Sequence, residues 1–189
     1  MARIIVSENI TLDGVSTDPT GEEGTTHGGW FTRIADADRA AWAAAEEDEA
    51  MHVDAVLMGR RSYDYFAPRW ADRPGAWAER FNSLPKYVLT SSPDPLAWRN
   101  STPVSGDLTE VAAKLKQEVD GDIVVYASGS LVPTLIKHDL VDELRLIVFP
   151  VLAGSGRAML ADSGSIRPLR LIESHPIGTN LTHVTYRPA

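Results

Sequence analysis

Residues 53–62 decide the class of fold, and they read Val53-Asp54-Ala55-Val56-Leu57-Met58-Gly59-Arg60-Arg61-Ser62. The short apolar run suits a strand that is buried on both faces, and Gly59 ends it. In an open α/β sheet, ligands bind beyond the carboxyl ends of the strands, where the helices that follow present free backbone N–H groups. The stretch therefore predicts an α/β sheet with a ligand site at that edge.

Two further strand ends have the same character. Val88-Leu89 is followed by Thr90-Ser91-Ser92, and Val125-Tyr126 is followed by Ala127-Ser128-Gly129-Ser130. Small residues let a diphosphate approach the backbone, hydroxyls donate to phosphate oxygens, and arginine binds phosphate with two parallel hydrogen bonds. Each turn alone is explained as well by chain punctuation or a surface cation. The three turns in order predict a cradle for a phosphorylated nucleotide.

The remaining pattern predicts one domain over residues 1–189. Expected strands span 3–11, 53–58, 86–90, 123–126, 144–149, 169–175 and 181–187. Expected helices span 36–51, 107–120 and 130–138, and residues 16–29 form a long polar loop. Strands and helices alternate first, and strands alone follow. This order predicts a three-layer α/β fold with a mostly parallel central sheet and antiparallel C-terminal strands.

Composition excludes several classes of protein. The 189 residues contain no cysteine, which rules out disulfide frameworks, thiolate zinc sites and cysteine nucleophiles. A net charge of -8 and a pI near 5.1 argue against nucleic acid as the main partner. The first apolar stretch is too short for a signal peptide, and no run approaches the length of a membrane span. We expect a cytoplasmic protein with neither a membrane nor a nucleic acid as partner.

The charge is unevenly distributed. Residues 36–54 carry seven acids and one arginine, whereas residues 57–80 carry five arginines and three acids. The locally basic stretch begins at Gly59-Arg60-Arg61, so an acidic chain can still hold one small phosphorylated ligand. The acidic run 46–49 is interpreted as a solvated helix face.

Common catalytic motifs are missing. The chain has no GxGxxG after its first strand, and no Walker A, HExxH or GxSxG pattern. The histidines lack metal-like spacing, so no metal site is expected. They are His27, His52, His138, His175 and His183.

Taken together, several segments resemble the dihydrofolate-reductase-like family. Within this family they are most similar to the riboflavin-biosynthesis branch, which is the C-terminal reductase domain (RibD C-terminal domain) of the bifunctional deaminase-reductases. The segments are 7–14, 56–63, 87–91, 128–131, 140–144 and 150–156, in this order. The resemblance covers nearly the whole chain. It implies NADPH as hydride donor and, as in the riboflavin branch, a homodimer. The zinc deaminase domain of the bifunctional enzymes has no counterpart here, so a free-standing reductase is expected.

The resemblance also implies where the cofactor binds. Gly59, Arg60 and Ser62 correspond to the family's Gly-Arg-x-Thr/Ser turn. Arg60 or Arg61, together with Thr90 and Ser91, would meet the adenosine 2′-phosphate. The family's glycine-rich diphosphate turn corresponds to Ser128, Gly129, Ser130 and Leu131, and Ala127 stands where the family often has another glycine.

The substrate side is less clearly marked. Leu12, Asp13 and Gly14 would belong to the mobile loop near the nicotinamide, and Asp36 or Asp38 lies where dihydrofolate reductases carry a carboxylate. Asp13 and Asp36 are therefore the candidate catalytic residues, although a turn for Asp13 and a helix N-cap for Asp36 or Asp38 explain them more simply. We expect a reductase of a small heterocyclic or ribosylaminopyrimidine-like substrate. A non-catalytic nucleotide-binding protein, a dihydrofolate or pterin reductase, and a flavin-using reductase are the alternatives.

Overall fold

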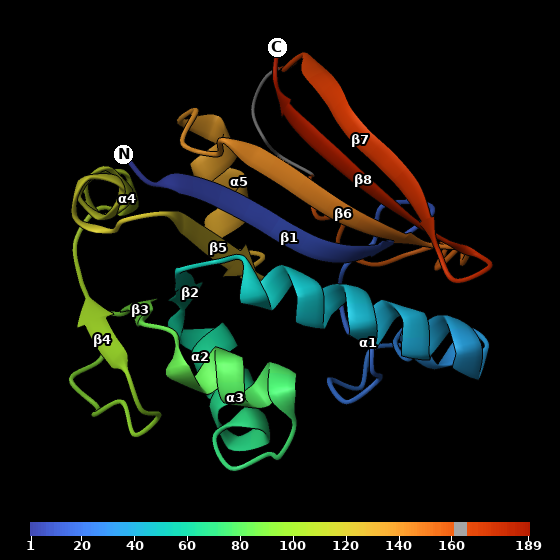
Figure 1. Cartoon of the computed structure of the whole chain (residues 1–189), viewed down its shortest axis with the longest axis horizontal. Helices are drawn as coiled ribbons and strands as arrows, with labels where there is room; N and C mark the ends of the chain where they lie inside the picture. Colours follow the sequence, from blue (N-terminus) through green and yellow to red (C-terminus); the bar gives the residue numbers. More distant parts are fainter. Residues whose placement is uncertain (161–165) are drawn as a thin grey trace.

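The structure, a computed structural model, describes residues 1–160 and 166–189 and contains one eight-stranded sheet (Figure 1). The strands are β1 (Arg3–Thr11), β2 (Ala55–Gly59), β3 (Lys86–Leu89), β4 (Ser101–Val104), β5 (Asp122–Tyr126), β6 (Glu143–Phe149), β7 (Leu169–Ile177) and β8 (Leu181–Pro188). The helices are η1 (Trp30–Arg33), α1 (Asp36–Met51), α2 (Arg60–Trp70), α3 (Ala76–Ser83), α4 (Leu108–Glu118) and α5 (Leu131–Lys137). The strand order is β4-β3-β2-β5-β1-β6-β8-β7.

The central strands are apolar throughout because helices cover both faces of the sheet. All five residues of β2 are buried, and β3 and β5 pair with β2 in parallel on its two sides. The α4 and α5 helices pack on one face against β1, β2 and β5, whereas α2 and α3 pack on the other. The α1 helix lies on the same side as α3 (Figure 1). The predicted three-layer fold is confirmed, with parallel pairing from β4 to β6 and antiparallel pairing at β8 and β7.

Four elements are missing from the sequence prediction, which left out η1, α2, α3 and β4. The α2 helix begins directly after Gly59 and contains Pro68 in its last turn, where proline removes a helical hydrogen bond and so argues against a helix in the sequence. The β4 strand is a short edge strand with Pro103 in the middle, so it lacks the apolar pattern of a central strand. Residues 60–83 and 101–104 therefore obtain their structure from packing and from pairing with β3.

The sheet has an unpaired edge beside β1. The β1–β5 pairing ends at Ser7 and Tyr126, whereas the β1–β6 pairing continues to Thr11 and Phe149. Residues 8–11 therefore have a strand on only one side. This unpaired segment lies at the carboxyl ends of the central strands, where α/β sheets bind ligands.

The burial of a lysine at the start of β3 predicts how the stability of the protein depends on pH. Lys86 is fully buried, and its ammonium donates to the carbonyl oxygens of Asn82, Leu84 and Arg99 at 3.2, 2.9 and 3.2 Å. Burial lowers the pKa of Lys86 to about 8. Between pH 8 and pH 10.5 the unfolded chain then binds more protons than the folded chain, so the free energy of unfolding rises with pH.

We expect Lys86→Met to remove this rise, which is about 1 to 2 kcal/mol after allowance for solvent screening. Urea unfolding of both proteins across that pH range measures the difference, and Lys114→Met, at an exposed lysine, is the control. A pH dependence that Lys86→Met shares with the wild type would show that Lys86 titrates normally.

Candidate functional site

Two of the three strand-end turns meet in the structure. The N–H of Gly59 donates to Oγ of Ser128 at 3.4 Å, and Ser128 Oγ donates to Oγ of Ser62 at 3.1 Å. The contact forms because β2 and β5 are parallel neighbours, so their carboxyl ends share one edge. Gly59, Ser62 and Ser128 therefore form one small, hydroxyl-lined cradle.

The turn after β5 has an unusual backbone. Ala127 and Ser128 both adopt left-handed φ values, 53° and 64°, which cost non-glycine residues about 1 to 3 kcal/mol each. Such a conformation suits glycine, so the side chains of Ala127 and Ser128 hold the turn in a strained backbone conformation. The N–H of Leu131 donates to the carbonyl oxygen of Ser128 at 2.7 Å and closes the turn.

The glycines leave room at this cradle. A Cβ on Gly59 would stand 3.7 Å from Leu131 Cγ and 3.8 Å from Ser130 Oγ, so an alanine would fit but would fill the space between the two turns. A Cβ on Gly129 would stand 3.7 Å from the guanidinium of Arg157. Arg157 is thus a cation at the site that the sequence prediction missed, since nothing marks it except its place after Gly154-Ser155-Gly156.

The two adjacent arginines point to different places. Arg60 pairs with Asp64 at 2.8 Å and donates to the carbonyl oxygen of Asp94 at 3.4 Å, which places it beside the turn that begins with Thr90 and Ser91. Arg61 pairs with Glu23 of the long loop at 2.8 Å. Arg61 and Arg157 line a cavity of about 420 Å³ between loops 17–27 and 155–157.

The hydroxyls of the turn after β3 are partly used by the turn itself. Thr90 Oγ1 accepts from the N–H of Ser92 at 3.0 Å, and Ser92 Oγ donates to Asp94 at 2.7 Å. Ser91 is exposed beside them. Arg60, Thr90 and Ser91 therefore lie together, apart from Arg61.

Both candidate catalytic aspartates are engaged elsewhere. Asp13 accepts from Thr11 Oγ1 and from the N–H groups of Gly154 and Ala153, and these hydrogen bonds lower its pKa to about 2. Asp36 is exposed and pairs with Arg39. Asp13 thus ties the loop after β1 to residues 153–154.

The N-cap interpretation of the aspartates on α1 is wrong. Ala35 is the N-cap residue, and no side chain caps this helix. Asp38 is buried and accepts from the N–H of Thr179 at 2.7 Å and from Asn180 Nδ2 at 2.7 Å. The Asn180 and Thr179 hydrogen bonds lower the pKa of Asp38. Asp38 therefore anchors the β7–β8 hairpin to α1.

The acidic run on α1 is only partly a solvated face, which corrects the sequence interpretation. Glu47 and Asp48 are exposed, whereas Glu46 and Glu49 turn toward β1. Asn9 Nδ2 donates to Glu46 Oε1 at 3.3 Å, and Ser7 Oγ donates to Glu49 Oε2 at 2.8 Å. These two carboxyl groups therefore lie beside β1, near its unpaired edge.

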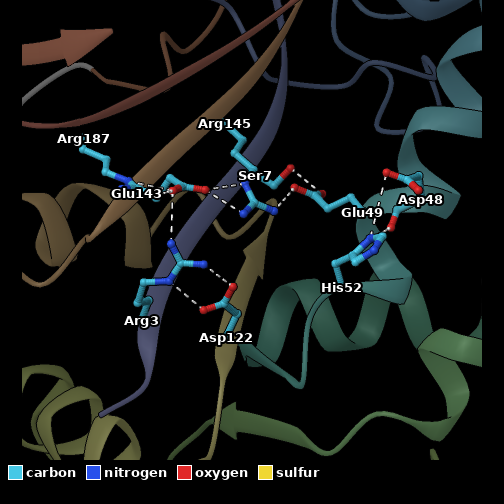
Figure 2. A network of polar contacts seen from close by, with 9 residues as sticks. All are labelled: Arg3, Ser7, Asp48, Glu49, His52, Asp122, Glu143, Arg145 and Arg187. Atoms are coloured by element: carbon cyan, nitrogen blue, oxygen red, sulfur yellow. Dashed lines mark hydrogen bonds and ion pairs between the residues drawn. The ribbon is translucent and has the colours of Figure 1, made fainter. Parts of the chain in front are cut away.

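A chain of ion pairs continues from Glu49 across the sheet. Arg145 on β6 reaches Glu49 at 3.1 Å and Glu143 at 2.6 Å (Figure 2). Glu143, 4% exposed, also accepts from Arg187 and Arg3. Glu49 is therefore fixed by a cation.

Comparison with known proteins identifies the family. The family model of the RibD C-terminal domain matches residues 2–183. The chain belongs to this family. The uncharacterized protein YyaP of Bacillus subtilis strain 168 is 27% identical over 190 residues, covering 97% of this chain and 94% of YyaP.

Two solved structures confirm the dihydrofolate-reductase-like fold of this RibD C-terminal domain. The diaminohydroxyphosphoribosylaminopyrimidine deaminase/5-amino-6-(5-phosphoribosylamino)uracil reductase of Thermotoga maritima superposes with a TM-score of 0.68 at 16% identity, over all of this chain and 57% of that one. Dihydrofolate reductase from Enterococcus faecalis, complexed with NADP(H), superposes with a TM-score of 0.64 at 13% identity, over 98% and 96% of the two chains.

The part of the chain that the structure describes lacks two kinds of feature. None of the described helices is long and apolar enough to cross a membrane. Within residues 1–160 and 166–189, no group of three or more His, Asp or Glu side chains is placed to hold a metal ion.

Proposed function

We propose that this RibD C-terminal domain is an NADPH-dependent reductase of a small heterocyclic or ribosylaminopyrimidine-like substrate. The observation that carries the proposal is the convergence of Gly59, Ser62 and Ser128 beside the unpaired edge of β1. Membership of the RibD C-terminal family supports it. The Thermotoga maritima reductase suggests the substrate class.

The residues of the cradle fit the parts of NADPH. Ser128, Gly129, Ser130 and Leu131 would receive the diphosphate, since Gly59 leaves the space in front of them open. Arg60, Thr90 and Ser91 would receive the adenosine 2′-phosphate, because Arg60 lies beside that turn. Arg61 and Arg157 add positive charge on the opposite side, at the 420 Å³ cavity. When bound, NADPH supplies the hydride.

Gly59→Ala tests the cradle. Gly59 has φ −80°, so alanine is not strained there, and its methyl group fits against Leu131 and Ser130. The methyl group would nevertheless occupy the space that the diphosphate needs. We expect the Kd for NADPH to rise about tenfold, equivalent to about 1.4 kcal/mol, with an unchanged unfolding temperature. An unchanged Kd in calorimetry would place the diphosphate elsewhere.

A non-catalytic nucleotide-binding protein is the second candidate function. The engagement of Asp13 and Asp36 in other contacts favours it, because neither is free to donate a proton. An assay that follows the absorbance of NADPH at about 340 nm, with a panel of pterins and ribosylaminopyrimidines as substrates, distinguishes the two functions. Oxidation of NADPH by one member supports the reductase. Binding of NADPH with constant absorbance across the panel supports the non-catalytic protein.

A further inference from the structure

Two acids on the same face of α1 lie in different environments. Glu49 is held by the guanidinium of Arg145 at 3.1 Å and by the hydroxyl of Ser7 at 2.8 Å. Among the described residues, Glu46, one turn earlier, has only neutral donors beside it, the amide of Asn9 at 3.3 Å and the indole of Trp42, and no cation pairs with it. A carboxyl group that is partly buried without a cation favours its protonated form.

The charges around Glu46 act in the same direction. Burial, together with the charges of Glu49 and Glu8, raises the pKa of Glu46 to about 8. Burial raises the pKa of Glu8, on β1, to about 8 as well. Arg145 on β6 is occupied by Glu49 and Glu143, and burial lowers the pKa of His183 on β8. A carboxyl group whose pKa is raised toward neutral pH is a candidate for a general acid.

The amide of Asn9 connects Glu46 to the unpaired edge of β1. Trp42 Nε1 donates to Asn9 Oδ1 at 2.8 Å, which turns the amide NH₂ group of Asn9 toward Glu46. Asn9 belongs to residues 8–11, which have no strand on the β5 side. Glu46 is therefore held, through Asn9, beside the unpaired segment of β1.

An independent observation points to a ligand at this place. Tyr126 ends β5 directly before the diphosphate turn and is only 7% exposed, yet its buried hydroxyl has no hydrogen-bond partner among the described residues. Burial raises the pKa of Tyr126, as do the charges of Glu49 and Glu46, and the carboxyl group of Glu49 lies near the hydroxyl although no hydrogen bond of normal geometry joins the two. A buried hydroxyl without a partner costs about 1 to 3 kcal/mol, which a polar ligand group would recover.

We propose that Glu46 is the general acid of the reduction, donating its proton to the nitrogen of a C=N group in the substrate. The inference rests on the proposed reductase function. The hydride of NADPH adds to the carbon, the C=N π electrons move to nitrogen, and nitrogen takes the proton of Glu46. NADP⁺ and an amine are the products, and the Glu46 carboxylate is reprotonated from solvent. Asn9 and Trp42 are positioning residues.

Glu46→Gln tests the role, because glutamine keeps the shape and the Asn9 contact but has no acidic proton. With 5-amino-6-(5-phosphoribosylamino)uracil as the probe substrate, we expect the single-turnover rate of NADPH oxidation to fall about 100- to 1,000-fold. The Kd for NADPH should change less than about twofold, and the fall in wild-type rate above pH 8 should disappear. Glu47→Gln, on the exposed face of the same helix turn, is the matched control.

A second readout needs no substrate. The infrared band of a protonated carboxylic acid should be present in the wild type at pH 7, weaken in Glu46→Gln and stay unchanged in Glu47→Gln. An equal band in Glu46→Gln, or a retained rate and pH profile, overturns the role of Glu46 while leaving the reductase intact. A wild type that binds NADPH but oxidises it with neither the probe nor any member of the panel overturns the reductase itself, and the role of Glu46 with it.

Discussion

Glu143→Ala is expected to lower the free energy of unfolding by about 2 to 3 kcal/mol. Glu143 is 4% exposed and accepts from the guanidinium groups of Arg145, Arg187 and Arg3 at 2.6, 2.8 and 3.4 Å (Figure 2). Breaking a buried ion pair by removing one partner costs about 3 to 5 kcal/mol, because the remaining charge is left uncompensated. We expect a loss at or below the lower end of that range, since Arg3 and Arg187 are about 40% exposed and their guanidinium groups recover some hydration.

Urea unfolding at pH 7 measures this loss, and Glu173→Ala, at an exposed residue of β7, is the control with an expected change below about 0.5 kcal/mol. Burial acts to raise the pKa of Glu143, but the Arg187 and Arg145 hydrogen bonds outweigh it and lower the pKa. The stability from Glu143 is therefore present above pH 4.5 and is lost as the pH falls through the lowered pKa. A loss below about 1 kcal/mol at pH 7 would contradict the network's contribution to stability.

Arg60→Ala is expected to raise the Kd for NADPH about 10- to 100-fold while changing the Kd for NADH less than about threefold. A hydrogen bond to a charged group contributes about 1.5 to 3 kcal/mol, and only NADPH carries the 2′-phosphate. The expected loss stays below the top of that range because Arg60 must share its guanidinium with Asp64 in the free protein.

Isothermal titration calorimetry at one ionic strength compares both cofactors for each variant. Arg61→Ala is the matched control, because Arg61 points to Glu23 instead of the turn after β3. It should weaken NADPH and NADH to the same small extent. An equal loss of NADPH and NADH in Arg60→Ala would refute the 2′-phosphate role of Arg60.

The sequence predicts the sheet well and the site less completely. Strands such as β2 and β5 are recognised because uninterrupted apolar runs are required where helices cover both faces. Arg60 and Arg61 cannot be distinguished by sequence, because neighbouring residues on a helix point about 100° apart and only the packing of α2 decides their directions. Arg157 joins the site from a segment about 30 residues after Gly129, without a motif of its own.

The acids on α1 show a second limit of prediction from sequence. Helical periodicity places Glu46 and Glu49 on one face and Glu47 on another. It does not say which face meets the sheet, since the deciding partners, among them Ser7 and Arg145, come from separate strands. A run of four acids therefore predicts a solvated face, although half of it lies against β1.

Titration of the wild-type protein with NADPH, with stability as the readout, tests the central claim most directly. At about 100 times its Kd, a ligand that binds only the folded chain adds about 2.7 kcal/mol to the free energy of unfolding. We predict that increase, saturating at one NADPH per chain. No change in stability and no heat of binding at millimolar NADPH would contradict the assignment of the Gly59, Ser62 and Ser128 cradle as a cofactor site.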